Sequence, residues 1–373
     1  MPAPHRFEPK RLQPQERDVE IVEIPEGRLE RARRAYSARR VPLDVAETLI
    51  RGAASPRAGD LVLAEVTKLR QHRRLELPDG RRAELFVGDE IVVCYANRYA
   101  PDQFEAEVPA DLGACHLVAG GGVASRMLSR HETMKPATEI RPLGLLGDRR
   151  GQPLNVLNWA LPSVLPPSRR PATLAVTGSS MNAGKTTACA HLIQGLKRSG
   201  RRVGAAKVTG TGSGGDTWLM RDAGADLVLD FVDAGYASTY RLPADKVCAI
   251  LRELTATLAV AGVDAIVLEV ADGLYQDETS SLLRSPAFAG TVATVLFAAG
   301  DAMGSAAGVE WLRRHDLPVT GVTGCLTRSP LAMREAELAT GLPVYDLDRL
   351  ADPRIAGELL QPIEMRAVAS PRP

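Results

Sequence analysis

The sequence lacks the long apolar runs and the charge imbalance that mark several large protein classes. No apolar run among the 373 residues approaches the length of a membrane span, and the charged, proline-containing start from Met1 to Glu20 has no secretory core. The formal net charge of +1 argues against a surface dedicated to nucleic acid. We therefore expect a cytoplasmic protein without a membrane partner, and nucleic acid is not its expected ligand.

Paired cysteine motifs are also missing. The five cysteines show no Cys-x-x-Cys spacing, so the sequence predicts reduced thiols and no structural zinc site. They are Cys94, Cys115, Cys189, Cys248 and Cys325. A composition of 45% hydrophobic and 24% charged residues is typical of a globular protein, and the length is sufficient for two domains.

A proline-rich stretch divides the chain. Residues 159–171 contain four prolines, which cannot continue a helix or a central strand, so we interpret this segment as a linker. We expect a β-rich N-terminal domain over residues 1–158 and an α/β domain over 172–350. Residues 351–373 are expected to form a C-terminal tail.

Short alternating runs separated by turn signals predict the β-rich domain. A small barrel or sandwich is expected, preceded by a helix from Gly27 to Arg40. The expected strands are Asp60–Val66, Arg73–Leu77, Arg82–Phe86, Glu90–Ala96 and Gln103–Val108. The basic residues Arg70, His72, Arg73 and Arg74 are interpreted as a solvated face, with an oligonucleotide surface as the alternative.

The second half alternates apolar strands with amphipathic helices. This pattern predicts an α/β fold in which a mainly parallel sheet is covered by helices on both faces. The expected strands are Thr173–Thr177, Arg202–Lys207, Asp226–Phe231, Ala265–Val270, Thr291–Ala298, Val319–Cys325 and Pro343–Leu347. The expected helices are Lys185–Arg198, Asp245–Ala261, Ala302–Arg314 and Pro330–Thr340.

A glycine loop between the first of these strands and its helix predicts a P-loop. Gly178 and Gly184 allow backbone conformations that point amide groups at phosphate oxygens. Lys185 supplies a mobile cation to the terminal phosphates, and Thr186 offers a hydroxyl to Mg²⁺. The predicted nucleotide-binding residues are Gly178, Ser180, Met181, Asn182, Ala183, Gly184, Lys185, Thr186 and Thr187.

Two charged residues follow strands of the same predicted sheet. Lys207 would add positive charge beside the P-loop, and Glu269 would hold Mg²⁺ directly or through water. Ligands of parallel α/β sheets bind at the carboxyl ends of the strands, which favours both positions over ordinary surface charges. Together with Lys185 these residues are the predicted catalytic groups. Asp272 and Asp277 are candidates for acid or base chemistry by location only.

The loop and the strand ends resemble dethiobiotin synthetase and the related cobyrinic acid amide synthases over residues 172–347. The usual four-residue spacing of a P-loop lands on Ser179, whereas Gly178 stands one place earlier, as in that family. The family's lysine and glutamate motifs are matched loosely by Lys207–Gly210 and partly by Glu269–Gly273. The stretch Gly321–Cys325 lacks the asparagine that often reads adenine in the family, so the sequence leaves the base open.

The resemblance implies a reaction and a set of roles. ATP phosphates and Mg²⁺ would be bound by Lys185 and Thr186, and Asp216 with Glu269 would complete the magnesium shell. Lys207 would steer a carboxylate or carbamate towards the γ-phosphate, and a nitrogen nucleophile would then displace phosphate. The resemblance also implies a homo-oligomer.

A weaker resemblance involves the stretch Thr209–Tyr236. It is similar to a P-loop family implicated in N-acyl D-amino-acid metabolism, which also carries a domain before its P-loop. The sequence thus predicts an ATP- and Mg²⁺-dependent enzyme that activates a small carboxylate for amide or carboxamide formation, with a small carboxylate or amine as substrate.

Two other functions remain open. An NTPase switch or metallochaperone would use hydrolysis to act on a protein partner. A small-molecule or polynucleotide kinase would use the β-rich domain for its substrate. The pocket is expected to be shaped by Gly210–Gly215, Leu274–Ser285 and Ser125–Lys135, and the triplet Gly120–Gly122 is interpreted as a turn.

Overall fold

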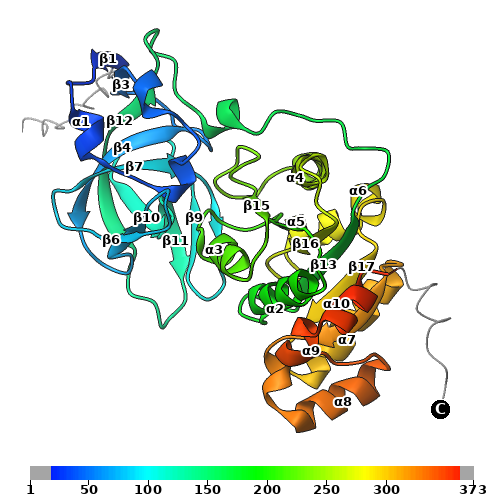
Figure 1. The fold of residues 1–373 in the computed structure, drawn as a ribbon. Coiled ribbons are helices and arrows are strands. Elements are labelled where there is room, and N and C mark those ends of the chain that lie inside the picture. The colour runs from blue at the N-terminus through cyan, green and yellow to red at the C-terminus, as the bar shows by residue number, and fades with distance from the viewer. Residues whose placement is uncertain (1–17, 362–373) are drawn as a thin grey trace, which may run out of the picture.

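The computed structural model describes residues 18–361, which form a β-rich part and an α/β part (Figure 1). The connection between them, residues 160–171, contains no helix or strand, in keeping with its proline content. This arrangement confirms the fold class that the sequence predicts.

Five strands of the N-terminal part close into a barrel. β4 pairs with β12 and β7, β7 with β11, β11 with β10, and β10 with β12, so the ring has no open edge. The strands are β4 (Leu61–Lys68), β7 (Glu90–Tyr95), β10 (Cys115–Ala119), β11 (Val123–Arg130) and β12 (Thr138–Gly147). The last three were not among the strands expected from the sequence.

Shorter strands extend this barrel. β1 pairs with β3, which pairs with β12, while β8 and β9 extend β11, β2 joins β7, and β5 and β6 form a separate hairpin. Their bounds are β1 (Glu20–Glu23), β2 (Arg33–Arg34), β3 (Thr48–Arg51), β5 (Arg74–Glu76), β6 (Arg82–Glu84), β8 (Arg98–Tyr99) and β9 (Phe104–Glu107).

Alternation along β4 supplies both cores of this part. Leu61 and Leu63 pack into one hydrophobic cluster, whereas Val62, Ala64 and Val66 pack into the other. A strand with a period of two and apolar residues on both sides is buried on both faces. This burial places the barrel wall between the two clusters.

The helix expected over Gly27–Arg40 is wrong. Helix α1 covers only Arg28–Arg31, β2 follows, and a 3₁₀ turn spans Tyr36–Ala38. The cause is tertiary: Arg33 and Arg34 pair with β7, and the Ala35 amide donates to the Val92 carbonyl. Pairing with a neighbouring strand has overridden local helix propensity.

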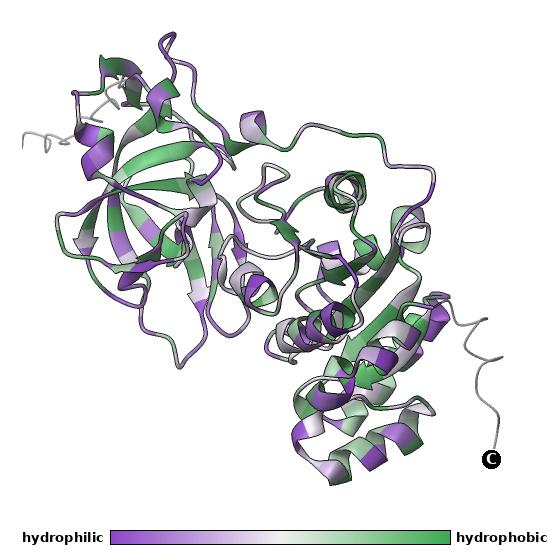
Figure 2. Ribbon diagram, in the orientation of Figure 1, coloured by the Kyte–Doolittle hydropathy of each residue, from purple (hydrophilic) through white to green (hydrophobic). Residues whose placement is uncertain are grey.

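The second part is a six-stranded sheet in which all pairs are parallel, in the order β15-β14-β16-β13-β17-β18. Figure 2 shows its strands as mostly hydrophobic, as expected for a sheet covered on both faces. The bounds are β13 (Ala172–Gly178), β14 (Val203–Lys207), β15 (Leu227–Asp230), β16 (Ala265–Glu269), β17 (Thr294–Ala298) and β18 (Val319–Thr323).

Helices cover both faces of this sheet. One hydrophobic cluster joins it to α2 (Lys185–Arg198), α3 (Gly215–Asp222), α9 (Leu347–Ala351) and α10 (Pro353–Leu359). The other joins it to α4 (Ala244–Val260), α5 (Asp277–Leu283), α6 (Pro286–Ala289), α7 (Ala302–Arg314) and α8 (Pro330–Thr340). Within β13, Leu174 and Val176 face the first cluster and Ala175 faces the second.

The C-terminal end differs from the sequence-based expectation. The strand expected at Pro343–Leu347 is wrong: only an isolated bridge joins Val344 to Val322, and α9 begins at Leu347. Helix α10 lies in the stretch expected as a tail and packs on α2, where a Cβ on Gly195 would come within 2.7 Å of the Ala356 Cβ. The close approach requires the glycine.

Candidate functional site

The predicted P-loop connects β13 to α2. A Cβ on Gly178 would lie 2.7 Å from the Ala298 carbonyl oxygen, and one on Gly184 would lie 3.0 Å from the Gly324 Cα. Gly184 also has a φ of 96°, which residues with a Cβ rarely adopt. The loop is therefore a tight backbone cradle at the amino end of a 14-residue helix, the arrangement that binds phosphate groups.

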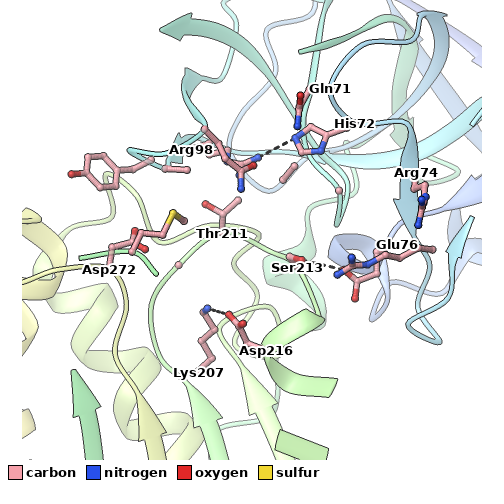
Figure 3. Close-up of a pocket in the computed structure, with 18 of the residues that line it drawn as sticks. Gln71, His72, Arg74, Glu76, Arg98, Lys207, Thr211, Ser213, Asp216 and Asp272 are labelled. Carbon is pink, nitrogen blue, oxygen red and sulfur yellow. Dashed lines mark hydrogen bonds and ion pairs between the residues drawn. The ribbon is translucent and has the colours of Figure 1, made fainter. Parts of the chain in front are cut away.

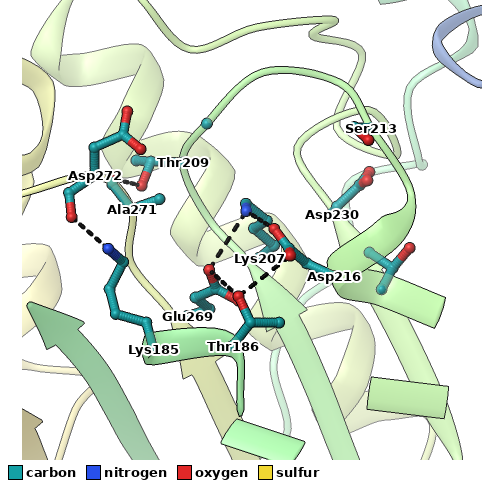
Figure 4. A network of polar contacts seen from close by, with 12 residues as sticks. Lys185, Thr186, Lys207, Thr209, Ser213, Asp216, Asp230, Glu269, Ala271 and Asp272 are labelled. Carbon is teal, nitrogen blue, oxygen red and sulfur yellow. Dashed lines mark hydrogen bonds and ion pairs between the residues drawn. The ribbon is translucent and has the colours of Figure 1, made fainter. Parts of the chain in front are cut away.

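Lys185 is folded over this cradle. Its Nζ donates to the Ser180 and Asp272 carbonyl oxygens, each at 2.7 Å (Figure 4). Burial lowers the pKa of Lys185, against the attraction of the Glu269 and Asp272 carboxylates. Backbone carbonyls are neutral acceptors, so this cation retains its charge for an anionic ligand.

Thr186, Asp216 and Glu269 meet beside the cradle (Figure 4). The Thr186 hydroxyl lies 3.1 Å from Glu269 Oε1 and 3.2 Å from Asp216 Oδ1. The three residues predicted to hold Mg²⁺ thus share one cluster, although they come from α2, α3 and β16. Hard cations such as Mg²⁺ prefer these oxygen donors.

Lys207 joins the same cluster. Its Nζ contacts the Asp216 carboxylate and lies 3.4 Å from Glu269 Oε1. Burial alone would lower the pKa of Lys207, but the Glu269 and Asp216 carboxylates outweigh it and raise the pKa. Burial likewise opposes ionisation of Asp216, yet Lys207 and the Thr186 hydroxyl lower its pKa.

The sheet register creates this cluster. Lys207 and Glu269 are direct partners in the β14–β16 pair, and Glu269 is also the partner of Val176 in β13. Three adjacent parallel strands therefore end beside the P-loop, where ligands of such sheets bind. Asp216 arrives separately, at the start of α3.

The donor set fits a nucleotide with a divalent cation. Glu269 Oε2 is buried without a hydrogen-bond partner, so this oxygen is available to a metal or its water. Within residues 18–361, no group of three or more His, Cys, Asp or Glu side chains is placed to hold a metal by itself. The cation would therefore draw its remaining ligands from phosphate oxygens and water.

A cavity of about 580 Å³ opens beside the cluster (Figure 3). The α/β part contributes Lys207, Asp216 and Asp272 to one side. The barrel part contributes the opposite side, whose charged and polar residues are Gln71, His72, Arg73, Arg74, Glu76, Arg82, Arg98, Tyr99 and Gln103. The volume is that of a small-molecule site, and its two walls come from different parts of the chain.

The β-rich part also forms hydrogen bonds with the segment that carries Asp216. The Glu76 carboxylate accepts from the Ser213 hydroxyl at 3.1 Å, the Gly214 amide at 3.1 Å and the Trp218 indole at 3.0 Å. The β-rich part also contacts the P-loop itself, because the Asn182 side-chain amide donates to Asp102 Oδ2 at 2.7 Å. The β-rich part is therefore a component of the site.

Other sequence-predicted loop residues take varied positions. The Ser180 hydroxyl donates to the Met181 carbonyl, and Met181 lines the cavity. Ala183 is buried, whereas Thr187 is exposed on α2. Asp272 lies in the cavity wall, but Asp277 is exposed on α5 and does not line it.

The three segments expected to shape the pocket contribute unequally. Gly210, Thr211 and Ser213 line the main cavity. Tyr275 and His131 instead line a neighbouring cavity of about 280 Å³ beside Ser179–Met181. Gly120 lines the main cavity from the turn between β10 and β11.

Several site residues were missed by sequence reasoning. Arg98, Gln103 and Glu76 lie in short strands or turns that no motif marks. Arg73 and Arg74 were interpreted as part of a solvated face; both are exposed, yet they line the cavity. The only sequence signal for this wall was the basic run itself.

No helix in the described part of the chain is long and apolar enough to cross a membrane. No protein-family model matches the chain, and no curated protein matches it.

The solved structures with distant similarity to this chain include signal recognition particle proteins and a cell division protein. The 54 kDa protein of Aeropyrum pernix, in complex with GDP, is 18% identical, with 51% of this chain and 47% of that chain covered and a TM-score of 0.36. The cell division protein FtsY of Thermotoga maritima is 17% identical, with 55% and 73% covered and a TM-score of 0.35. The receptor FtsY of Elizabethkingia anophelis, in complex with GDP, is 15% identical, with 54% and 57% covered and a TM-score of 0.33.

The match spans about half the length of the Aeropyrum pernix protein. Similarity of this extent assigns neither ligand nor activity to this chain.

Proposed function

We propose that this protein is an ATP- and Mg²⁺-dependent enzyme that activates a small carboxylate-bearing metabolite by γ-phosphoryl transfer, for amide or carboxamide formation. One observation carries the proposal. The P-loop cluster around Lys185, Thr186 and Glu269 adjoins a cavity of about 580 Å³ that contains Lys207 and Asp216. A small acceptor in that cavity would lie next to the terminal phosphate.

The proposed reaction has two balanced steps. A carboxylate oxygen of the substrate attacks the γ-phosphorus of ATP, the bond to the β-phosphate bridging oxygen breaks, and ADP leaves with that electron pair. A nitrogen nucleophile then attacks the acyl carbon, phosphate leaves, and the nitrogen loses a proton. Bound Mg²⁺ would supply positive charge that neutralises the phosphate oxygens.

The chain's own residues would position these groups. Lys185 would exchange its carbonyl acceptors for phosphate oxygens, and Thr186, Asp216 and Glu269 would hold the cation. Lys207 would balance charge between the substrate carboxylate and the transferred phosphoryl group. Asp272 is buried and its pKa is raised by that burial, against Lys185 and Lys207. It is suited to accept a proton from the nitrogen nucleophile.

The choice of ATP over GTP is part of the proposal and follows the resemblance to dethiobiotin synthetase. The loop after β18 contacts the P-loop, because the Cys325 amide donates to the Ala183 carbonyl at 3.0 Å. The expected homo-oligomer and cytoplasmic location are likewise proposals, and the five cysteines form no disulfide, which is compatible with a reducing compartment.

The test is a hydroxylamine-trapping assay with purified full-length protein, ATP, Mg²⁺ and a panel of small carboxylic acids. We expect slow ATP turnover alone, faster turnover with a suitable acid, and a hydroxamate from the trapped acyl phosphate. Lys185→Ala should abolish both signals, whereas Lys246→Ala, at an exposed position on α4, should keep them. Steady hydrolysis that no acid stimulates, without hydroxamate, would exclude the ligase reaction.

An NTPase switch is a second candidate, favoured by the hydrogen bonds between the β-rich part and the segment that carries Asp216. Glu76 accepts hydrogen bonds from Ser213, Gly214 and Trp218. A displacement of the Asp216 segment at the cation site would therefore be transmitted to the β-rich part. In that case, hydrogen exchange at residues 210–218 would differ between ATP-analogue and ADP complexes, and turnover would respond to a protein partner instead of a small acid.

A kinase would share the first step of this chemistry. The cavity volume of about 580 Å³ favours a small molecule over a polynucleotide as its acceptor. A stable phosphorylated product in place of a hydroxamate would identify this activity, and strong salt dependence of RNA binding would identify the polynucleotide version.

A further inference from the structure

Arg98 stands in the barrel wall of the cavity without a charged partner. It lies in the two-residue strand β8, is only 5% exposed, and points towards the space above Thr211 (Figure 3). Among the described residues, it makes no ion pair, and its buried Nε has no hydrogen-bond partner. A buried guanidinium is normally paired, because an unmatched charge is costly to remove from water.

The remaining donors of Arg98 are weakly used. Nη2 donates to Gln103 Oε1 at 2.8 Å, and Nη1 lies 3.4 Å from His72 Nε2. That imidazole nitrogen is also 2.9 Å from the Val118 carbonyl oxygen, which can only accept. A proton on Nε2 therefore serves the carbonyl and leaves Arg98 Nη1 without an acceptor.

The surroundings keep Arg98 positive and its neighbour neutral. Burial lowers the pKa of Arg98 to about 10, against Asp102 and Asp272, so the group remains charged near neutrality. Burial and the Arg98 charge lower the pKa of His72 to about 4. Arg98 is thus the buried cation of this wall, whereas Arg73, Arg74 and Arg82, which also line the cavity, are exposed.

Arg39 provides the contrast. It is also largely buried, yet its Nη2 lies 2.6 Å from Asp230 and 2.8 Å from Asp233. Its role is to join the two parts of the chain. Arg98 has no such carboxylate, although its wall faces the cavity that contains Lys207 and Asp216.

We propose that Arg98 binds a carboxylate at the end of the substrate remote from the phosphoryl-accepting group, so that the enzyme acts on small dicarboxylates. The inference rests on the proposed function, because Lys207 and the P-loop define the reacting end. A carboxylate offers one charge and two oxygens to a guanidinium fork, which matches one buried arginine whose hydrogen-bond partners, Gln103 and His72, are neutral. A phosphate dianion would carry one charge more than this buried fork, and the other arginines of the wall are exposed to solvent.

Arg98 acts in this proposal through binding and has no part in the transfer itself. Its removal should raise KM for a dicarboxylate while kcat stays nearly unchanged at saturation. An arginine that stabilised the transferring phosphoryl group would instead lower kcat for every acid, and a purely structural residue would reduce nucleotide affinity as well.

The test measures calorimetric affinities of the full-length protein, with Mg²⁺ and a non-hydrolysable ATP analogue, for succinate, glutarate and adipate. Butyrate, valerate and hexanoate are the controls with the same carbon numbers but only one carboxylate. Methylphosphonate and 3-phosphonopropionate test the phosphate alternative. We expect one dicarboxylate to bind about 10 to 100 times more tightly than its monocarboxylate, the usual range for a hydrogen-bonded charge pair.

Two variants locate that preference. Arg98→Gln should abolish the dicarboxylate advantage while leaving the affinity for the ATP analogue unchanged. Gln103→Glu keeps the Arg98 guanidinium but places a carboxylate beside it within the protein. This variant should therefore remove the preference for dicarboxylates without deleting side-chain volume. Both variants are compared with Arg74→Gln. Arg74 is an exposed arginine of the same wall, and it already pairs with Glu84 at 2.7 Å.

The outcomes separate this inference from the proposed function. An Arg98-dependent dicarboxylate preference without hydroxamate formation would support the binding site and reject the ligase. Acid-stimulated hydroxamate formation with no dependence on Arg98 would do the reverse. Failure of every dicarboxylate to bind at millimolar concentrations, or tighter binding of the phosphonates, overturns the assignment of Arg98.

Discussion

The Tyr36 hydroxyl, beside the barrel, donates a 2.8 Å hydrogen bond to the Asp230 carboxylate at the end of β15. The same hydroxyl lies 3.0 Å from the Thr217 hydroxyl in α3, one residue after Asp216. Arg39 covers the Tyr36 ring at 4.1 Å and pairs with the same carboxylate. The β-rich part therefore fixes the helix that carries a proposed magnesium ligand.

Tyr36→Phe tests this link. We expect the free energy of unfolding to fall by about 1–3 kcal/mol, because a buried carboxylate oxygen and a buried hydroxyl lose their shared partner. Urea denaturation followed by tryptophan fluorescence measures it. Tyr275→Phe is the control, since Tyr275 is 86% exposed; equal stability of Tyr36→Phe and the wild type would contradict the link.

Glu269→Gln tests the cation site. The substitution keeps the size of the side chain but removes a charge beside Thr186 and Lys207, so the Mg²⁺ concentration needed for half-maximal nucleotide binding should rise about tenfold or more. A magnesium titration at fixed ATP-analogue concentration measures this shift. Glu310→Gln, on exposed α7, should titrate like the wild type, and an unaltered curve for Glu269→Gln would place the cation elsewhere.

The sequence predicts the α/β part well because its signals are local. Helix α2 spans Lys185–Arg198 in both prediction and structure, since a glycine precedes it and an apolar period runs through it. Lys207 and Glu269 were located by the rule that ligands bind at strand ends. Asp216 was predicted as a metal ligand only from the family resemblance, because the glycine-rich stretch Gly210–Gly215 gives no local signal for the start of α3.

The barrel wall escaped prediction because its contacts are distant in sequence. Closure depends on pairs such as Cys115 with Ile140, which no local pattern specifies. Arg98 is one arginine in a two-residue strand, and its burial follows from Phe104, Gln103 and His72 packed around it. Local periodicity carries no information about such burial.

His72→Gln should change how stability depends on pH. An unfolded histidine takes up a proton near pH 6.5, whereas burial and the Arg98 charge lower the pKa of His72 to about 4. Between these values the unfolded chain binds the additional proton, so stability is lost as the pH falls from about 6.5 towards 4. The variant should lose less stability over this window, by about 1–3 kcal/mol.

Urea denaturation at pH 7.5, 5.5 and 4.5 measures this difference. Carboxyl groups titrate in both proteins over the same range, and their effects cancel in the comparison. His131→Gln changes an exposed histidine and should follow the wild type. Parallel pH profiles for wild type and His72→Gln would show that His72 is protonated in the folded state.

Gly121→Ala tests whether the turn between β10 and β11 must approach the α/β part closely. A Cβ at Gly121 would lie 2.1 Å from the Gly212 carbonyl oxygen, a backbone atom that cannot move without shifting residues 210–215. We expect the clash to cost about 1–3 kcal/mol of stability and to speed hydrogen exchange in that loop. Gly120→Ala is the matched control, since its nearest atom would be the Arg74 carbonyl oxygen at 3.9 Å. Unfolding by urea and exchange mass spectrometry compare the two variants; if both behave like the wild type, the contact between the barrel turn and the loop before Asp216 is not maintained in solution.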